Sequence, residues 1–273
     1  MLRAWCLIRE NPHYRRQAFI AGIKAAGYDF KPGEPGAEVA AGDVLVIWNR
    51  YSHWEVMAAQ FERRGGRVLV AENGYLGANG TTPKFDVAAG AVRPEHYYAL
   101  AWDGHNGAGR WPADDGSRWR ALHVTLKPWR EGGTHVLVCP QRGIGPKRGT
   151  QPAEWTQDAC KRLAALTRRP VRVRPHPGLG PGAVPIAEDL QDCWAVVIWA
   201  SGAGIHALLA GVPVFSEGPH WICTGAASRN LAMIEDPAMD NERRLSAFER
   251  LACAQWTVAE IASGEAFNRL LAS

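Results

Sequence analysis

Two polar segments, each at the end of an expected strand, carry the residue types best suited to hold a phosphate. The segment 174–177, Arg-Pro-His-Pro, closes a strand expected over 170–174, and the segment 201–204, Ser-Gly-Ala-Gly, follows the apolar run 195–199 and opens a helix. Ligands of parallel α/β sheets bind at the carboxyl ends of strands, where a helix N-terminus offers N–H groups to phosphate. We therefore expect a phosphorylated ligand here. Ordinary βαβ packing is the alternative, because such loops recur in folds that bind no nucleotide.

The side chains of these segments suggest separate roles. His176 lies between two prolines that fix its backbone, which suits a donor aimed at a phosphate oxygen; a strand-end histidine that binds water is the alternative. Ser201 is expected to cap the helix, while Gly202 and Gly204 let the backbone approach a ligand. His206, one turn into the helix, either reaches the ligand or packs against the sheet.

A third loop, Pro-Gln-Arg-Gly-Ile-Gly at 140–145, follows the apolar strand expected over 135–139. Its glycines and its arginine favour phosphate binding over a plain surface turn. The full set of residues predicted to bind the phosphorylated ligand is Gln141, Arg142, Gly143, Arg174, His176, Ser201, Gly202 and His206.

If the phosphorylated ligand gives up a group to a hydroxyl, a base must take the hydroxyl proton, unless the leaving phosphate does so itself. Glu72 directly follows the apolar strand expected over 67–71 and is the leading candidate. Asp103 and His105, between glycines in a polar loop, are the reserve. A purely structural role as a turn cap is the alternative for either carboxylate. No acidic pair follows a strand convincingly, so neither a metal nor any other cofactor is predicted.

The elements that must position these residues form two α/β halves. Alternating and continuous apolar runs predict strands, and amphipathic stretches predict helices. Segments 78–126 and 127–133 are predicted as long loops facing a cleft between the halves and as a hinge, respectively. The remaining expected elements are strands 4–8, 44–48, 67–71, 135–139, 170–174, 195–199 and 212–215 and helices 15–26, 54–64, 155–166, 242–254 and 257–271.

Length and composition agree with a globular protein of two domains. The chain has 273 residues, 47% hydrophobic and 21% charged, a net charge of +4 and twelve tryptophans. No apolar run is long enough for a membrane span or a signal peptide, so a cytoplasmic protein without a membrane partner is expected. Six scattered cysteines show no metal or disulfide pattern and are expected to be buried, reduced thiols.

The two polar segments also resemble a known family. Arg-Pro-His-Pro and Ser-Gly-x-Gly-x-x-Ala-Leu-Leu-x-Gly-x-Pro-Val are similar to motifs of GT-B glycosyltransferases, in particular bacterial capsule-polysaccharide transferases, where they hold the phosphates of the donor nucleotide. In the first half, Glu72-Asn73-Gly74-Tyr75-Leu resembles their acceptor-side Glu-Asp-Gly-Phe-Leu. Asn73 departs from that pattern, which puts a catalytic role for this position in doubt.

This resemblance implies an α/β fold of the GT-B type, with two Rossmann-like domains facing a central cleft. It also implies a nucleotide-sugar as the co-substrate. The expected domains are an acceptor-side domain at 1–130, a donor-binding domain at 131–240, and C-terminal helices at 241–273 that cross back to the first domain. The resemblance extends to short phage-encoded relatives, and the oligomeric state stays open.

The acceptor is the least determined part of the prediction. Arginine pairs and tryptophans suit a polyanion whose bases stack, although arginine pairs are also common on solvated helix faces. We favour a glycosyltransferase that modifies a hydroxymethylated pyrimidine in phage DNA. A capsule or surface glycan transferase, a nucleotide-sugar epimerase and a non-catalytic nucleotide- or polyanion-binding protein are the alternatives. The predicted acceptor-binding residues are Arg50, Asn73, Tyr75, Arg110 and Arg118.

Overall fold

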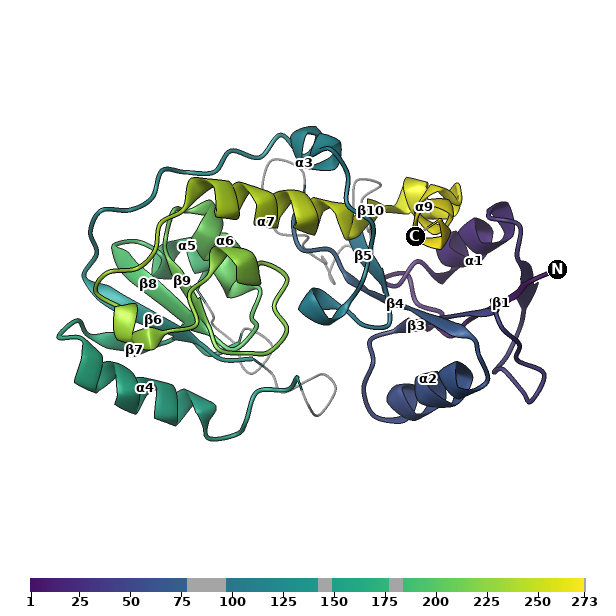
Figure 1. Ribbon diagram of the computed structural model, residues 1–273, viewed down its shortest axis with the longest axis horizontal. Helices are drawn as coiled ribbons and strands as arrows, with labels where there is room; N and C mark the ends of the chain where they lie inside the picture. Colours follow the sequence, from purple (N-terminus) through teal and green to yellow (C-terminus); the bar gives the residue numbers. More distant parts are fainter. Residues whose placement is uncertain (78–96, 142–148, 177–183, 273) are drawn as a thin grey trace. The chain divides into compact units, whose positions relative to one another are not determined.

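The computed structural model describes residues 1–77, 97–141, 149–176 and 184–272. It divides into two compact units, each built on its own mainly parallel sheet (Figure 1). Unit 1 comprises Met1–Val124 together with Glu249–Ser273, and unit 2 comprises Thr125–Phe248. Helix α7 (Asn241–Cys253) starts in unit 2 and ends in unit 1.

The sheet of unit 1 has the strand order β10-β5-β4-β3-β1-β2. Strands β2, β1, β3 and β4 are parallel, and β5 is antiparallel to both β4 and β10. The elements of this unit are β1 (Arg3–Cys6), α1 (Arg16–Ala25), β2 (Asp29–Lys31), β3 (Val44–Trp48), α2 (His53–Arg63), β4 (Arg67–Asn73), β5 (Tyr97–Trp102), α3 (Ser117–Ala121), β10 (Gln255–Thr257), α8 (Val258–Ala262) and α9 (Glu265–Leu271).

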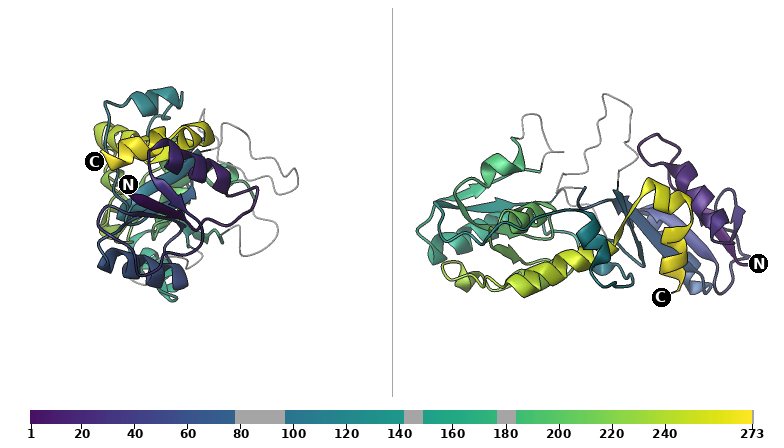
Figure 2. Two further views of the ribbon diagram at one scale, coloured as in Figure 1. Left: turned by 90° about the vertical axis from the view of Figure 1, so that its right-hand side faces the viewer. Right: turned by 90° about the horizontal axis from the view of Figure 1, so that it is seen from above.

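Period-two alternation along the strands divides the core of unit 1 between two faces. One face buries Val44, Val46 and Leu69 under α1, α8 and α9, and the other buries Leu45 and Ile47 under α2. Both views of Figure 2 show the yellow α9 beside the purple α1, although about 240 residues separate them in the chain. The C-terminal segment is therefore part of the first core.

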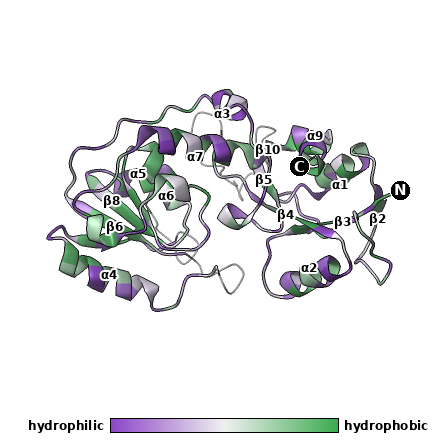
Figure 3. Ribbon diagram, viewed as in Figure 1, coloured by the Kyte–Doolittle hydropathy of each residue, from purple (hydrophilic) through white to green (hydrophobic). Residues whose placement is uncertain are grey.

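Unit 2 repeats the same parallel arrangement on a smaller scale. Its strand order is β7-β6-β8-β9, with every pair parallel. Its elements are β6 (His135–Cys139), α4 (Trp155–Leu166), β7 (Val171–Val173), α5 (Ile186–Asp189), β8 (Cys193–Ile198), α6 (Ala203–Leu209) and β9 (Val214–Ser216). Figure 3 shows β6 and β8 as hydrophobic and α4 as mixed, as expected for strands covered on both faces by amphipathic helices.

Several expected elements need correction. The first half contains an additional strand, β2, and β4 extends through Asn73. Within the segment expected to be loops, β5 and α3 form, while residues 78–96 lie outside the described part. The single helix expected over 257–271 is two helices, because Gly264 adopts φ +85° between them, and it is preceded by the short strand β10.

The cysteines and the helices also bear on the sequence predictions. All six cysteines are free thiols, and burial raises the pKa of Cys139 to about 12 and that of Cys6 to about 11. A thiol with so high a pKa is a poor nucleophile at neutral pH. Across the described ranges, every helix is too short or too polar to span a bilayer.

Candidate functional site

The carboxyl edge of the sheet in unit 2 collects most of the residues predicted to bind the donor. Strand order in this unit reverses between β6 and β8, because β7 lies on one side of β6 and β8 on the other. In open α/β sheets, ligands bind at such a switch point. Gln141 follows β6, Arg174 and His176 follow β7, and Ser201 follows β8. Arg142 and Gly143 lie outside the described residues.

Two hydrogen bonds engage the described residues on either side of positions 142–148. The backbone N–H of Gln141 donates to Oε1 of Gln151 at 2.7 Å, and Nε1 of Trp199 donates to the carbonyl of Gly149 at 2.8 Å. Trp199 comes directly after β8, so it joins the two loops that flank the switch point. Sequence reasoning missed both Gln151 and Trp199, because their partners lie ten and fifty residues away.

The start of α6 differs in detail from the prediction. The capping position is Gly202, and the half-buried Ser201 instead accepts a bond from the Ala203 N–H at 3.3 Å. A Cβ on Gly202 would meet nothing within 4 Å, so this glycine lies beside open space. A Cβ on Gly204 would approach the Trp221 ring to 2.6 Å. Gly204 is therefore required by packing of the helix rather than by approach to a ligand.

Arg174, just after β7, lies close enough to His206 of α6 for its charge to act on that imidazole. Arg174 pairs with Asp189 and donates to the Val184 carbonyl at 2.7 Å, so its guanidinium anchors α5. Arg174 thus supports α5, and direct phosphate binding by its guanidinium stays a prediction. Burial, and secondarily the positive charge of Arg174, lowers the pKa of His206. His206 is therefore neutral at pH 7. His176, half-buried, remains the candidate hydrogen-bond donor of this edge.

A carboxylate at the end of β9 is not available for chemistry. Glu217 accepts two bonds from Arg162 at 2.5 and 2.6 Å and one from Nε1 of Trp155 at 2.7 Å. Burial by itself would raise the pKa of Glu217, but these bonds from Arg162 and Trp155 outweigh it and lower the pKa. The arrangement fixes α4 against the carboxyl edge of the sheet.

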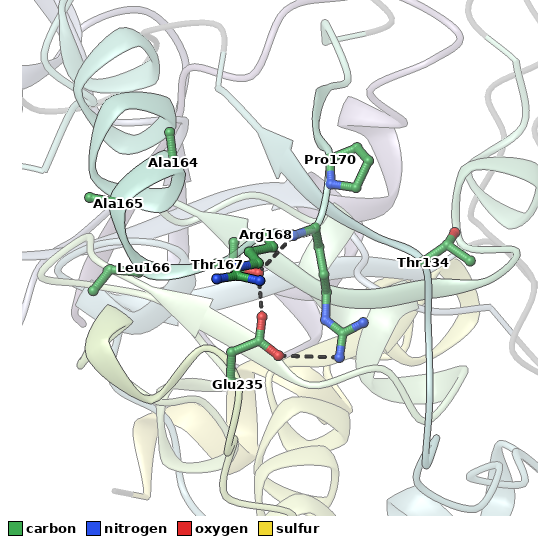
Figure 4. Close-up of a pocket in the computed structure, with 9 residues that line it drawn as sticks. Thr134, Ala164, Ala165, Leu166, Thr167, Arg168, Pro170 and Glu235 are labelled. Atoms are coloured by element: carbon green, nitrogen blue, oxygen red, sulfur yellow. Dashed lines mark hydrogen bonds and ion pairs between the residues drawn. The ribbon is translucent and has the colours of Figure 1, made fainter.

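A cavity of about 820 Å³ opens at the opposite, amino-terminal edge of the same sheet. Figure 4 shows Arg168, Thr167 and Glu235 gathered there at the end of α4. The neighbouring Arg169 bonds the Gly133 carbonyl at 2.6 Å, pairs with Glu235 at 3.2 Å and stacks on Trp194. Its guanidinium thus joins β8 to Glu235 and to the segment before β6, and the cavity lies at the end of the sheet away from the switch point.

In unit 1, Glu72 is the second-last residue of strand β4 and does not lie in a loop after it. Its Oε1 accepts the backbone N–H of Asn73 at 2.8 Å, and its side chain is half-buried. The chain beyond it is fixed by Gln255 of β10, whose buried amide accepts from the N–H groups of Tyr75 and Leu76 at 2.9 and 3.0 Å and donates to the Leu76 carbonyl at 2.7 Å. Sequence reasoning missed Gln255.

The reserve candidates lie at the other end of β4. The Asp103 N–H donates to the Val68 carbonyl at 2.9 Å. Val68 lies four residues before Glu72 in β4, which is about 13 Å along a strand. One reacting hydroxyl cannot contact both side chains. Asp103 also pairs with Arg110 at 2.5 Å, and burial lowers the pKa of His105. The hydroxyl of Tyr75 accepts the Asn106 N–H at 2.9 Å and so ties the two loops together.

The arginines predicted to bind the acceptor are engaged within unit 1. Arg50 pairs with Glu55 at 2.7 Å and Glu62 at 2.6 Å, and Arg118 pairs with Glu260 at 2.8 Å. Their side chains are only 12% and 13% exposed. Arg110, paired with Asp103 as described above, is 69% exposed. Arg50 and Arg118 thus brace the fold, and their role in acceptor binding stays a prediction.

In the described part of the chain, no three His, Cys, Asp or Glu side chains form a group able to hold a metal ion.

Comparison with known proteins finds likeness in structure alone. No protein-family model and no curated protein matches the chain. Among solved structures, the β-Kdo 2,7-transferase KpsC of Thermosulfurimonas dismutans superposes with a TM-score of 0.55 and 13% identity, over 97% of this chain and 99% of that one. The β-Kdo 2,4-transferase KpsC of the same organism gives 0.55 and 13%, over 93% and 90%. The chain thus has the α/β, GT-B-like fold of these glycosyltransferases.

Proposed function

We propose that this protein is a glycosyltransferase that moves a sugar from a nucleotide-activated donor to a hydroxyl group of a glycan. The observation that carries the proposal is the polar carboxyl edge at the switch point of unit 2, where the residues after β6, β7 and β8 converge. The GT-B-like fold, found over nearly the whole of two Kdo transferases, supports the same activity.

On the donor side, the proposal assigns the nucleotide phosphates to His176 and Ser201. His176 donates to a phosphate oxygen and stabilises the negative charge that develops as the nucleotide leaves, which is the largest contribution that fixed donors usually make. Ser201 and the adjoining open space at Gly202 accommodate the second phosphate. The neutral His206 adds a hydrogen-bonding group without a second positive charge.

On the acceptor side, the proposal assigns proton removal to Glu72. Its half-buried carboxylate stands near the carboxyl end of β4, and the bonds of Gln255 to residues 75 and 76 keep the adjoining chain in place. Attack of the acceptor hydroxyl on the anomeric carbon breaks the bond to the nucleotide phosphate, and Glu72 takes the hydroxyl proton. Asp103 is not favoured, because Arg110 occupies its carboxylate.

A glycan acceptor is favoured over DNA. The DNA hypothesis relied on arginines that neutralise phosphates, and two of the three named for it are largely buried in ion pairs. The structural likeness is to enzymes named as Kdo transferases. A net charge of +4 spread over 273 residues does not by itself require a polyanionic partner.

The donor assignment is tested by measuring binding and transfer with UDP-, GDP- and CMP-activated sugars. His176→Ala should lower kcat/KM by an amount that corresponds to a loss of about 2–4 kcal/mol of transition-state stabilisation. The matched control is His220→Ala, an exposed histidine of the same unit, which should behave as wild type. Full activity of His176→Ala would refute the donor assignment.

The base is tested separately. Glu72→Gln should lower kcat about a hundredfold while donor affinity stays unchanged, because the amide cannot accept the proton. Glu34→Gln, an exposed position of unit 1, is the control. Retention of DNA on the wild-type protein at about 50 mM salt, with affinity falling log-linearly as salt rises, would instead revive the DNA hypothesis.

A further inference from the structure

A second cavity, of about 480 Å³, lies in unit 1 beside the loop that follows β1. Its lining includes Glu10, Asn11, Arg15, Arg16, Gln17 and Val258. The strand order of unit 1 reverses between β1 and β3, so the cavity stands at the switch point of this sheet, as the donor segments do in unit 2. Its volume is typical of sites for small molecules, which occupy roughly 300–1,000 Å³.

The lining has more positive than negative charge. The lining residues include two arginines, Arg15 and Arg16, and one acidic residue, Glu10. Glu10 accepts a bond from Arg16 at 2.9 Å and bonds from Gln17 at 3.2 Å, and these bonds lower its pKa. Because Glu10 is 63% exposed, its pair with Arg16 is screened by water and contributes little. An incoming anion can therefore replace Glu10 as the partner of Arg16.

The other lining groups suit a sugar ring. Asn11 uses its Oδ1 to accept the His13 N–H at 2.8 Å, which leaves its amide N–H groups for hydroxyls. Ala18 and Val258 provide small apolar surfaces against which the face of a ring can pack. Strand β3 separates β1 from β4, so the strand that leads to the cavity lies about 10 Å across the sheet from the strand that carries Glu72.

We propose that this cavity binds an acidic sugar residue of the acceptor glycan, with Arg15 and Arg16 holding its carboxylate or phosphate. The assignment rests on the proposed transferase function and adds the charge of the acceptor to it. Guanidinium groups bind both kinds of anion through paired hydrogen bonds. The acceptor residue held here lies on the same edge of the sheet as the hydroxyl that Glu72 activates.

Binding is tested first on the full chain without a donor. Amide signals of residues 10–18 are followed by NMR while glucuronic acid, glucose 1-phosphate or glucose is added. Either acid, but not glucose, should shift these signals; a response to glucuronic acid alone identifies a carboxylate sugar, and one to glucose 1-phosphate alone identifies a phosphorylated sugar. Equal shifts with glucose, or shifts confined to other residues, would overturn the proposal. This measurement needs no variant and so does not depend on the folding of one.

Arg16→Gln should then weaken binding of the acid at least about tenfold, while Arg63→Gln, an exposed arginine of α2, should not. In transfer assays Arg16→Gln should raise KM for acidic acceptors with kcat and donor affinity unchanged. An unchanged KM would refute the site. Acid binding at residues 10–18 in a protein that transfers no sugar would uphold the site and refute the transferase function. Transfer without any response of residues 10–18 would refute the site alone.

Discussion

Replacing Arg118 by alanine is the sharpest test of whether this arginine braces unit 1 or serves an acceptor. The guanidinium donates to Glu260 at 2.8 and 3.3 Å and to the carbonyls of Gln255 and Ala252 at 2.7 and 3.3 Å. It also lies over the Trp256 ring at 4.0 Å. Alanine would remove all these contacts at once from the segment that completes the core.

The expected loss is about 3 kcal/mol of unfolding free energy. Breaking one partner of a buried ion pair typically costs 3–5 kcal/mol. The lower end applies because the side chains of Arg118 and Glu260 keep 13% and 23% exposure and because Thr257 still caps the carboxylate at 2.6 and 2.9 Å. Burial raises the pKa of Glu260, and the bonds from Arg118 and Thr257 more than offset this. The stability that Glu260 contributes is therefore lost as pH falls through its lowered pKa.

Hydrogen exchange followed by peptide is the appropriate assay, because a chain of two units need not unfold in one step. Peptides from β10, α8 and α9 should lose protection in Arg118→Ala, while those from β6 and β8 keep theirs. Arg120→Ala, whose side chain is 63% exposed, is the control and should change little. A loss below about 0.5 kcal/mol, together with a raised KM for the acceptor, would show that Arg118 acts on substrate and not on the fold.

Three further outcomes are expected. Gly211→Ala should cost at least about 2 kcal/mol in urea unfolding, because φ is +75° and a Cβ would lie 1.9 Å from the Pro128 carbonyl, whereas Gly202→Ala should stay within about 0.5 kcal/mol. Gln255→Leu should lower kcat and local protection together, because the part-buried N–H of Tyr75 and the buried N–H of Leu76 lose their acceptor. Burial lowers the pKa of His105, His135 and His206, so the unfolded chain binds more protons and the melting temperature should fall as pH drops below about 6.5; a flat profile from pH 7.5 to 5 would contradict this.

Local residue patterns predicted those helices and strands whose structure follows from the residues of the segment itself. The apolar run Val44–Trp48 and the amphipathic stretch Trp155–Leu166 fold as expected, because burial on both faces and a 3.6-residue period are visible in the residues themselves. Strand β10 was missed because its three residues become a strand only by pairing with β5, about 155 positions earlier. Long-range pairing of this kind leaves no local signal.

The candidate site divides in the same way. Side chains at strand ends, such as His176 and Ser201, were located because topology alone places them on one edge. The partners that decide what a side chain is free to do were not predictable. Asp189 engages Arg174, and Glu62 engages Arg50, from separate elements of the fold. A basic residue next to a candidate site therefore indicates charge in that region, and its availability to a ligand depends on contacts that only the three-dimensional structure gives.

The discontinuity of unit 1 has a consequence for biosynthesis. Trp256, Ile261, Phe267 and Leu270 complete the core around α1, yet the ribosome adds them after every residue of unit 2. Domains generally fold as they emerge, so unit 2, although later in sequence than most of unit 1, is the first to have its whole core available. Until β10 is synthesised, β5 is the edge strand of the sheet of unit 1 and has no partner on that side. Such an unpaired edge is of the kind that chaperones protect.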